Sequence, residues 1–305
     1  MALERKHLIG LEGVAREEIE LFLDTATSFK EVLDRPIPKV PTLRGKTIVN
    51  LFFESSTRTR FSFELAEKRL SADTINFSAS TSSVKKGESL RDTAQNIEAM
   101  RVDMVVIRHG AAGAPYMLTK WIKGSVINAG DGCHEHPTQA LLDMMTLREK
   151  FGTLKGLRVA IIGDILHSRV ARSNLYGLTT MGAEVAFCAP SPLIPVEANR
   201  WPAKIFYDVD KAIQWADVIM LLRIQMERQQ ANFFPSLREY HNYFGITKER
   251  LDRSSKKLTI MHPGPINRGI EIESTLADSE YSVILNQVTN GVAVRMAVLY
   301  LLSGE

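Results

Sequence analysis

Hydroxyl and guanidinium groups are concentrated in one short stretch of the chain, FFESSTRTRFSFE at residues 52–64. Residues 55–60 carry four hydroxyls and two guanidiniums between an apolar segment and a segment of helical character. The first turn of a helix leaves backbone N–H groups unpaired, and the helix dipole there favours negative charge. Arg58 adds a forked guanidinium that suits phosphate oxygens. A helix N-cap needs only one hydroxyl, so this excess of donors predicts an anion site.

Further charged and amide side chains follow other apolar runs. They are Arg108 and His109 in VVIRHG, Arg169 and Arg172 in HSRVARSN, and Arg223 and Gln225 in LLRIQMER. Arginines at the start of a helix suit a carboxylate ligand, and the turn at Pro263-Gly264-Pro265 offers backbone carbonyls that can line a pocket. The loop SASTSSVKKGES contains Lys85 and Lys86, but Ser- and Lys-rich loops are by themselves typical of a solvated surface.

Metal and cofactor motifs are weak in this sequence. The pair His134 and His136 lacks the third and fourth ligands that zinc needs, so we expect no metal and assign His136 a hydrogen bond to a carbonyl oxygen instead. The segment IIGDILHSRVARSN resembles a dinucleotide-binding turn but has Gly163 alone in place of G-x-G-x-x-G. We therefore expect no cofactor.

General bases are scarce among these clusters. The sequence shows no Ser-His-Asp arrangement, no P-loop lysine motif and no paired acidic motif. A site rich in donors and poor in bases is suited to bind a multiply charged anion and to stabilise an oxyanion. We expect proton transfer to be left largely to the reactants.

Composition limits the class of protein. The chain has 305 residues, 45% hydrophobic and 24% charged, with Lys+Arg 38 against Asp+Glu 35. This near balance of charge argues against a nucleic-acid binder. Cys133 and Cys188 form neither a disulfide framework nor a zinc motif, and no segment has the apolar run of a secretory signal or a membrane span. We expect a cytoplasmic protein.

Apolar strand-like segments alternate with helix-like ones along the chain. An amphipathic helix over residues 14–34 comes first, and strands in KTIVNLFF, DTINF, DMVVIRH and GSVINAG alternate with helices up to PTQALLDMMTLREKF. The alternation restarts near residue 157 and ends in the apolar segment LNQVTNGVAVRMAVLYLLSG. This pattern predicts an α/β protein of two domains, each a mainly parallel sheet flanked by helices. Ligands of such sheets bind at the carboxyl ends of strands, where the polar clusters lie.

The motifs together resemble a known family. SSTRTR, VKKGES, IRH, HPTQ, GDILHSRVARSN, RIQMER and HPGPINRG occur over essentially the whole chain in an order similar to transcarbamoylases, and most similar to the aspartate carbamoyltransferase catalytic chains. The ornithine branch would show HCLP where this chain has HPGP. The resemblance implies a carbamoyl-phosphate-binding domain at residues 1–150, an aspartate-binding domain at 151–285, and a C-terminal helix at about 286–305 that packs back on the first domain.

The resemblance also implies a reaction and its residues. Carbamoyl phosphate and L-aspartate would give N-carbamoyl-L-aspartate and phosphate, an early step of pyrimidine biosynthesis. The phosphate would be held by Ser56, Thr57, Arg58 and Thr59, the carbamoyl group by Thr59, Arg108, His136 and Gln139, and the aspartate by Lys86, Arg169, Arg223 and Gln225. The backbone of Pro263 and Gly264 would orient the reacting groups, and the role of His167 is left open. Ser82 and Lys86 would come from a neighbouring subunit, which implies a homotrimer.

Two alternatives remain open at this point. A transcarbamoylase for ornithine or an acylated ornithine would share most motifs, although a cationic side chain would be repelled by Arg169 and Arg223. A non-catalytic anion-binding scaffold would be expected to have lost some of these residues. Regulatory chains and a dihydroorotase-type partner are known in the family, and the sequence decides neither.

Overall fold

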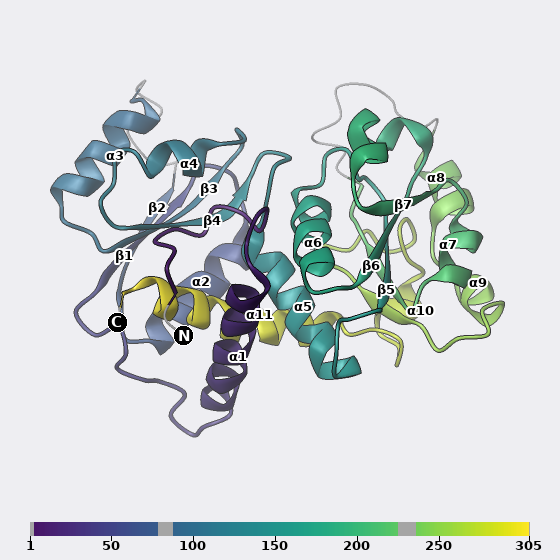
Figure 1. Cartoon of the computed structure of the whole chain (residues 1–305), viewed down its shortest axis with the longest axis horizontal. Helices are drawn as coiled ribbons and strands as arrows, with labels where there is room; N and C mark the ends of the chain where they lie inside the picture. The colour runs from purple at the N-terminus through teal and green to yellow at the C-terminus, as the bar shows by residue number, and fades with distance from the viewer. Residues whose placement is uncertain (1–2, 79–87, 225–235, 305) are drawn as a thin grey trace. The chain divides into compact units, whose positions relative to one another are not determined.

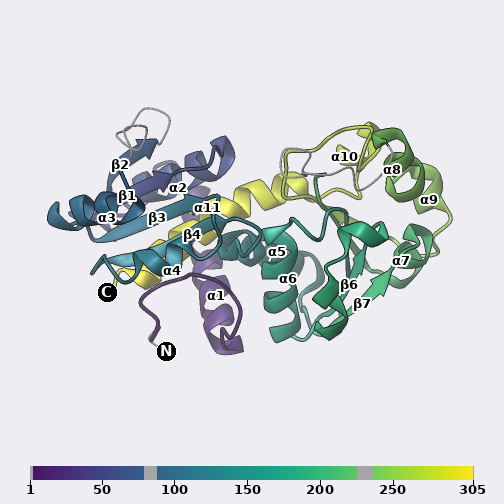
Figure 2. The same cartoon turned by 90° about the horizontal axis from the view of Figure 1, so that it is seen from above.

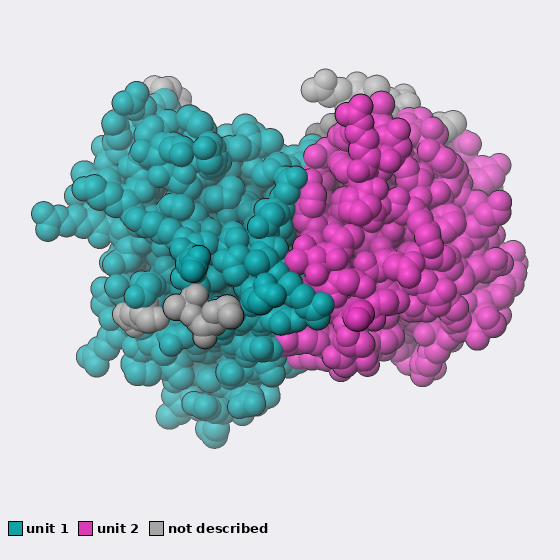
Figure 3. Space-filling view, viewed as in Figure 1, with its two compact units in different colours: residues 1–145, 289–305 teal, residues 146–288 magenta. Residues whose placement is uncertain are grey.

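The computed structural model describes residues 3–78, 88–224 and 236–304. The chain divides into two compact units, residues 1–145 with 289–305 and residues 146–288, which are coloured separately in Figure 3. The helices α5 (Pro137–Phe151) and α11 (Ile284–Leu302) each contribute residues to both units. No helix within the described ranges has both the length and the apolarity needed to cross a membrane.

The first unit is built on a parallel sheet of order β2-β1-β3-β4 (Figure 1). Its elements are α1 (Arg16–Leu33), β1 (Thr47–Phe52), α2 (Thr57–Arg69), β2 (Asp73–Ser78), α3 (Leu90–Ala99), β3 (Met104–His109), α4 (Ala114–Leu118) and β4 (Ser125–Asp131). One face of the sheet forms an apolar core with Ala94 and Ile97 of α3 and Leu118 of α4. The other face meets α2, because Asn50 of β1 donates a hydrogen bond to Glu67. Covering both faces explains why the central strands β1 and β3 are mostly apolar and buried, whereas the edge strand β2 is more polar and exposed.

Helix α11 packs on this first unit. Tyr300 contacts the ring of Phe29 in α1, and Arg295 donates a hydrogen bond to Ser62 of α2. The helix carries no Asp, Glu or Lys, and most of its residues from Asn290 to Leu302 are buried. In Figure 2 the yellow helix runs along the sheet of this unit. The predicted packing of the C-terminal helix on the N-terminal domain is confirmed.

The second unit is built on a parallel sheet of order β7-β6-β5-β8-β9. Its elements are β5 (Arg158–Ile162), α6 (Arg169–Thr180), β6 (Glu184–Cys188), η3 (Ser191–Leu193), η4 (Val196–Arg200), β7 (Ala203–Phe206), α7 (Val209–Trp215), β8 (Val218–Leu221), α8 (Leu237–Phe244), α9 (Lys248–Asp252), β9 (Thr259–Met261) and α10 (Ser274–Ala277). Its core joins Ile162, Ile219 and Ile260 from three strands to Ala212 and Ile213 of α7. The predicted fold class, two α/β units with parallel sheets, is confirmed.

Candidate active site

The start of α2 presents the predicted hydroxyl-rich segment after β1. Ser56 is the N-cap residue in extended conformation, and its carbonyl accepts a hydrogen bond from Arg60 N at 3.1 Å. Its hydroxyl makes no capping hydrogen bond to the described part of the chain, so the helix start keeps donors for a ligand. Thr57 and Arg58 are exposed, whereas Thr59 is 9% exposed. The segment has the form of an anion site at a helix N-terminus.

Arg108 lies beside this segment because of strand register. Phe52 of β1 pairs with Arg108 of β3, so both strands end at one level. The Arg108 guanidinium donates to Ala129 O of β4 at 3.2 Å, and its Nε lies 3.6 Å from Glu54 Oε2. Glu54 was not predicted, although it stands within the hydroxyl-rich stretch. Its carboxylate offsets part of the positive charge at this strand end.

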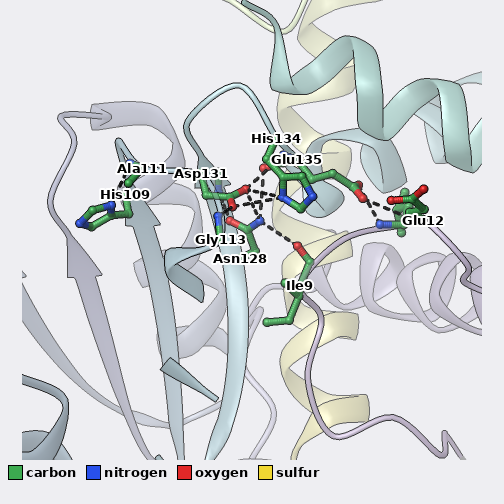
Figure 4. Close-up of polar contacts among 11 residues, drawn as sticks. Ile9, Glu12, His109, Ala111, Gly113, Asn128, Asp131, His134 and Glu135 are labelled. Atoms are coloured by element: carbon green, nitrogen blue, oxygen red, sulfur yellow. Dashed lines mark hydrogen bonds and ion pairs between the residues drawn. The ribbon is translucent and has the colours of Figure 1, made fainter. Parts of the chain in front are cut away.

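The turn between β4 and α5 is held by a buried carboxylate (Figure 4). Asp131 accepts hydrogen bonds from Gly113 N at 2.8 Å, Asn128 Nδ2 at 2.8 Å and Glu135 N at 3.1 Å. The ring nitrogen Nδ1 of His134 lies 3.1 Å from the same carboxylate. Burial raises the pKa of Asp131, but these hydrogen bonds outweigh burial and leave its pKa below the ordinary value. Asp131 therefore stays charged and rigidifies the turn that precedes α5.

His136 and Gln139 follow this turn and are almost fully buried, at 4% and 8% exposure. The strand before them, β4, pairs with β3, so His136 and Gln139 follow a strand end that lies next to the end of β3, where Arg108 is located. His134 instead bonds Asp131, and in the described ranges no three His, Cys, Asp or Glu side chains are placed to hold a metal ion. Residues predicted for phosphate and carbamoyl recognition thus follow three adjacent strands, β1, β3 and β4.

Arg169 is the first residue of α6 and is only 4% exposed. The preceding turn is tied together by Asp164, whose Oδ1 accepts a hydrogen bond from His167 N at 3.2 Å and lies 2.8 Å from His167 Nδ1. Gly163 starts the turn at φ +134°, where a Cβ would lie 2.7 Å from Leu222 O. A side chain is excluded there because the turns after β5 and β8 approach closely.

Arg223 follows β8, the neighbour of β5 in the sheet. The next residue, Ile224, donates its N–H to Glu271 Oε1 at 3.0 Å, and Glu271 also accepts hydrogen bonds from Asn267 N and Nδ2. Burial raises the pKa of Glu271. Glu271 was not predicted because its partners lie in another loop. It links the Arg223 segment to the loop that follows β9.

The turn at Pro263 and Gly264 follows β9, which pairs with β8. Gly264 N donates to His262 Nδ1 at 2.8 Å, and His262 N donates to Gln287 Oε1 at 3.0 Å. The second unit thus presents Arg169, Arg223 and this turn after three adjacent strands. Ser82, Lys86 and Gln225 lie outside the described residues.

Comparison with known proteins agrees with this arrangement. Residues 6–149 match the family description "Aspartate/ornithine carbamoyltransferase, carbamoyl-P binding domain", and residues 155–302 match its "Asp/Orn binding domain". The aspartate carbamoyltransferase catalytic subunit of Cytophaga hutchinsonii is 60% identical over 99% of both chains.

Solved structures are similar over almost the whole chain. The ornithine carbamoyltransferase of Pyrococcus furiosus has a TM-score of 0.87 and 30% identity, covering 99% of this chain and 98% of its own. The aspartate transcarbamoylase of Trypanosoma cruzi in complex with carbamoyl aspartate and phosphate has a TM-score of 0.86 and 29% identity, covering 96% and 95%. The chain therefore belongs to the aspartate/ornithine carbamoyltransferase family.

Proposed function

We propose that this chain is an aspartate carbamoyltransferase. It transfers the carbamoyl group of carbamoyl phosphate to the α-amine of L-aspartate, which gives N-carbamoyl-L-aspartate and phosphate for pyrimidine biosynthesis. The 60% identity to a catalytic subunit of that name over 99% of the chain carries the assignment. The fold alone does not decide the branch, since an ornithine carbamoyltransferase has a similar TM-score to an aspartate enzyme.

The cations of the second unit support aspartate as the acceptor. Arg169 and Arg223 follow neighbouring strands, and each guanidinium can hold a carboxylate through two hydrogen bonds. L-Aspartate has two carboxylates, whereas ornithine has a cationic side chain that these groups would repel. Lys86 and Gln225 complete the proposed set, with the backbone of Pro263 and Gly264.

The first unit supports binding and activation of carbamoyl phosphate. Ser56, Thr57 and Arg58 bind the phosphate at the start of α2, where the helix dipole adds to the attraction. Thr59, Arg108 and His136 donate hydrogen bonds to the carbonyl oxygen, and Gln139 binds the carbamoyl NH₂. Ser82 and Lys86 join this set from a neighbouring subunit of a homotrimer.

The reaction then needs little acid–base machinery. The uncharged amine of aspartate forms a bond to the carbonyl carbon, and donors to the oxyanion stabilise the tetrahedral intermediate. Loss of one such donor typically costs about 10²–10³ in rate. The C–O bond to phosphate breaks, and the departing phosphate accepts the amine proton. Binding both anions in register supplies much of the remaining acceleration.

Product formation from carbamoyl phosphate with aspartate, and separately with ornithine or an acylated ornithine, tests this proposal. We expect turnover with aspartate alone. Turnover only with the ornithine substrates would overturn the assignment, and tight phosphate binding without any turnover would favour a non-catalytic scaffold.

The shared site has its own test. Mixing the inactive variants Arg58→Ala and Lys86→Ala should restore activity in hybrid trimers, because some sites then contain neither substitution. Verified mixed trimers without activity would contradict a contribution of Lys86 from the neighbouring subunit. Regulatory chains or a dihydroorotase-type partner would be detected as additional bands when the complex is purified from its native cell.

A further inference from the structure

The side-chain amide of Gln139 is held by a second residue of α5. Gln139 Nε2 donates a hydrogen bond to Asp143 Oδ1 at 3.0 Å, one helical turn further along. Gln139 is 8% exposed and Asp143 is fully buried. An amide has one donor end and one acceptor end. Because one N–H of Nε2 is donated to Asp143, the NH₂ end of the amide faces Asp143 and the acceptor Oε1 lies on the other side, available to a ligand.

A buried arginine of α11, Arg295, carries a positive charge that interacts electrostatically with this carboxylate. Arg295 is 3% exposed, and its Nη1 donates to Ser62 Oγ of α2 at 2.9 Å and to Gly291 O at 2.8 Å. Burial lowers the pKa of Arg295 to about 10, while the charge of Asp143 acts in the opposite direction. Arg295 therefore remains protonated at neutral pH. Its guanidinium also lies 5.1 Å from the centre of the Phe63 ring.

Close helix packing brings these groups together. A Cβ at Gly291 of α11 would lie 2.7 Å from Arg295 Nη1 and 3.2 Å from Leu142 Cδ2 of α5. A glycine inside a helix costs about 1 kcal/mol relative to alanine. Here a side chain would collide with Arg295 of the same helix and crowd Leu142 of α5. Helix α11 thus contacts α2 through Arg295 and Ser62, and it approaches α5, which carries Gln139, at Gly291 and Leu142.

We propose that Asp143 is a positioning residue that fixes the Gln139 amide with Oε1 toward the carbamoyl NH₂. This orientation makes the site selective for a carbamoyl over an acyl group. The inference rests on the proposed function and deepens it. The carbamoyl NH₂ is a donor and needs an acceptor. A rotated Gln139 amide would place its own NH₂ against it, leaving two donors face to face. Asp143 excludes that orientation because a carboxylate accepts hydrogen bonds and does not donate them.

Two stable phosphonates test this role without requiring turnover. Phosphonoacetamide and acetonylphosphonate differ in having NH₂ or CH₃ on the carbonyl carbon, and calorimetry measures the dissociation constant of each and of inorganic phosphate. The unsubstituted protein should prefer the amide by about tenfold or more, the usual effect of one hydrogen bond. Gln139→Ala should abolish this preference and leave phosphate binding within about threefold.

Asp143→Asn should reduce the preference because its amide can also pair with a rotated Gln139. The charge-balanced variant Asp143→Leu/Arg295→Met removes both ionic groups and avoids an unpaired buried charge. This double variant should lose the preference for the amide, as Gln139→Ala does. Adding Gln139→Ala to the double variant should cause no further loss of that preference. Glu67→Gln, which removes another buried carboxylate of the same unit, should retain the full preference.

These outcomes distinguish a role of Asp143 in selectivity for the amide from a general role in the structure of the site. Retention of the amide preference in both Asp143 variants would overturn the inference, as would an equal loss of phosphate, amide and ketone binding. Absence of preference in the unsubstituted protein would overturn the orientation of Gln139. Selectivity without any turnover of carbamoyl phosphate and aspartate would refute the proposed function and leave the orienting role intact.

Discussion

Glu135 Oε2 accepts a hydrogen bond from the backbone N–H of Leu11 at 2.7 Å, although 124 residues separate them in sequence. Glu135 Oε1 accepts a second one from Glu12 N at 3.1 Å. Figure 4 shows the carboxylate reaching Glu12 from the turn that precedes His136. Leu11 and Glu12 are therefore hydrogen-bonded to the turn that precedes His136, a residue of the proposed carbamoyl site.

The variant Glu135→Ala should lose both hydrogen bonds. Charge-assisted hydrogen bonds each contribute about 1.5–3 kcal/mol, so we expect the loss of two to lower the free energy of unfolding by about 3–6 kcal/mol in urea titrations. Amide exchange at Leu11 and Glu12 should accelerate. Glu20→Ala, which breaks only the exposed pair with Arg16, should change stability by less than about 0.5 kcal/mol. Unchanged exchange at Leu11 in Glu135→Ala would refute this role.

Glu67 should make stability depend on pH. Burial raises its pKa from 4.5 to about 7, despite a hydrogen bond from Asn50. Since the folded-state pKa is above the unfolded value, the charged form is penalised, and stability falls as pH rises from about 4.5 to 7. Glu67→Gln should remove a penalty on the order of 3 kcal/mol at pH 8 and none of it below pH 4.5.

Urea titrations of both proteins between pH 4.5 and 8.5 measure this difference. Glu64→Gln is the matched control in the same helix, because a hydrogen bond from Lys68 lowers the pKa of Glu64. Because that pKa lies below 4.5, the stability difference between Glu64→Gln and the unsubstituted protein should stay nearly constant across this pH range. If the free energies of unfolding of Glu67→Gln and the unsubstituted protein changed in parallel with pH, ionisation of Glu67 would not destabilise the folded protein.

Gly163→Ala should disturb the second unit at the proposed aspartate residues. The added Cβ would meet Leu222 O and Cβ at 2.7 and 2.9 Å, directly before Arg223. We expect a loss of about 3 kcal/mol or more in stability and a raised KM for aspartate. Gly156→Ala is at a position that also has a positive φ, +77°, but open space around it. About 1–2 kcal/mol should be lost there, with the KM for aspartate unchanged. If the two substitutions changed stability and the KM for aspartate equally, the clash with Leu222 would be excluded as the cause of the Gly163→Ala effects.

Arg169→Lys should weaken aspartate binding selectively. Lysine retains the charge but loses the planar fork that holds a carboxylate with two hydrogen bonds. We expect the KM for aspartate to rise about 10–100-fold, with a change of less than about threefold in the KM for carbamoyl phosphate.

The matched control is Arg172→Lys in the same helix, where the guanidinium pairs with Glu197 at 3.2 Å. Its KM values should stay within about threefold of the unsubstituted protein, because exposed pairs contribute little. If both variants raised the KM for aspartate equally, the special role of Arg169 would be refuted.

Several elements were not predicted from the sequence. The edge strand β7 has only four residues and no fully buried side chain, so it lacks the apolar run that indicates a strand. Helices α4, α9 and α10 have at most five residues, too few to show a helical period. Helix α8, with eight residues, was also not predicted, and Tyr240 is its one fully buried residue. Most of the longer elements were predicted because each buries a whole face, and that burial imposes a period on the residue types.

The sequence by itself determined the alternation of strands and helices and the kinds of groups at strand ends, since both depend on neighbouring residues. Only the tertiary structure decided which distant groups become partners. The pairs Glu54 with Arg108, Ser62 with Arg295, and Glu271 with Ile224 N depend on strand order, register and helix packing. Those are set by burial of the sheets as wholes, and no local pattern of residues encodes them.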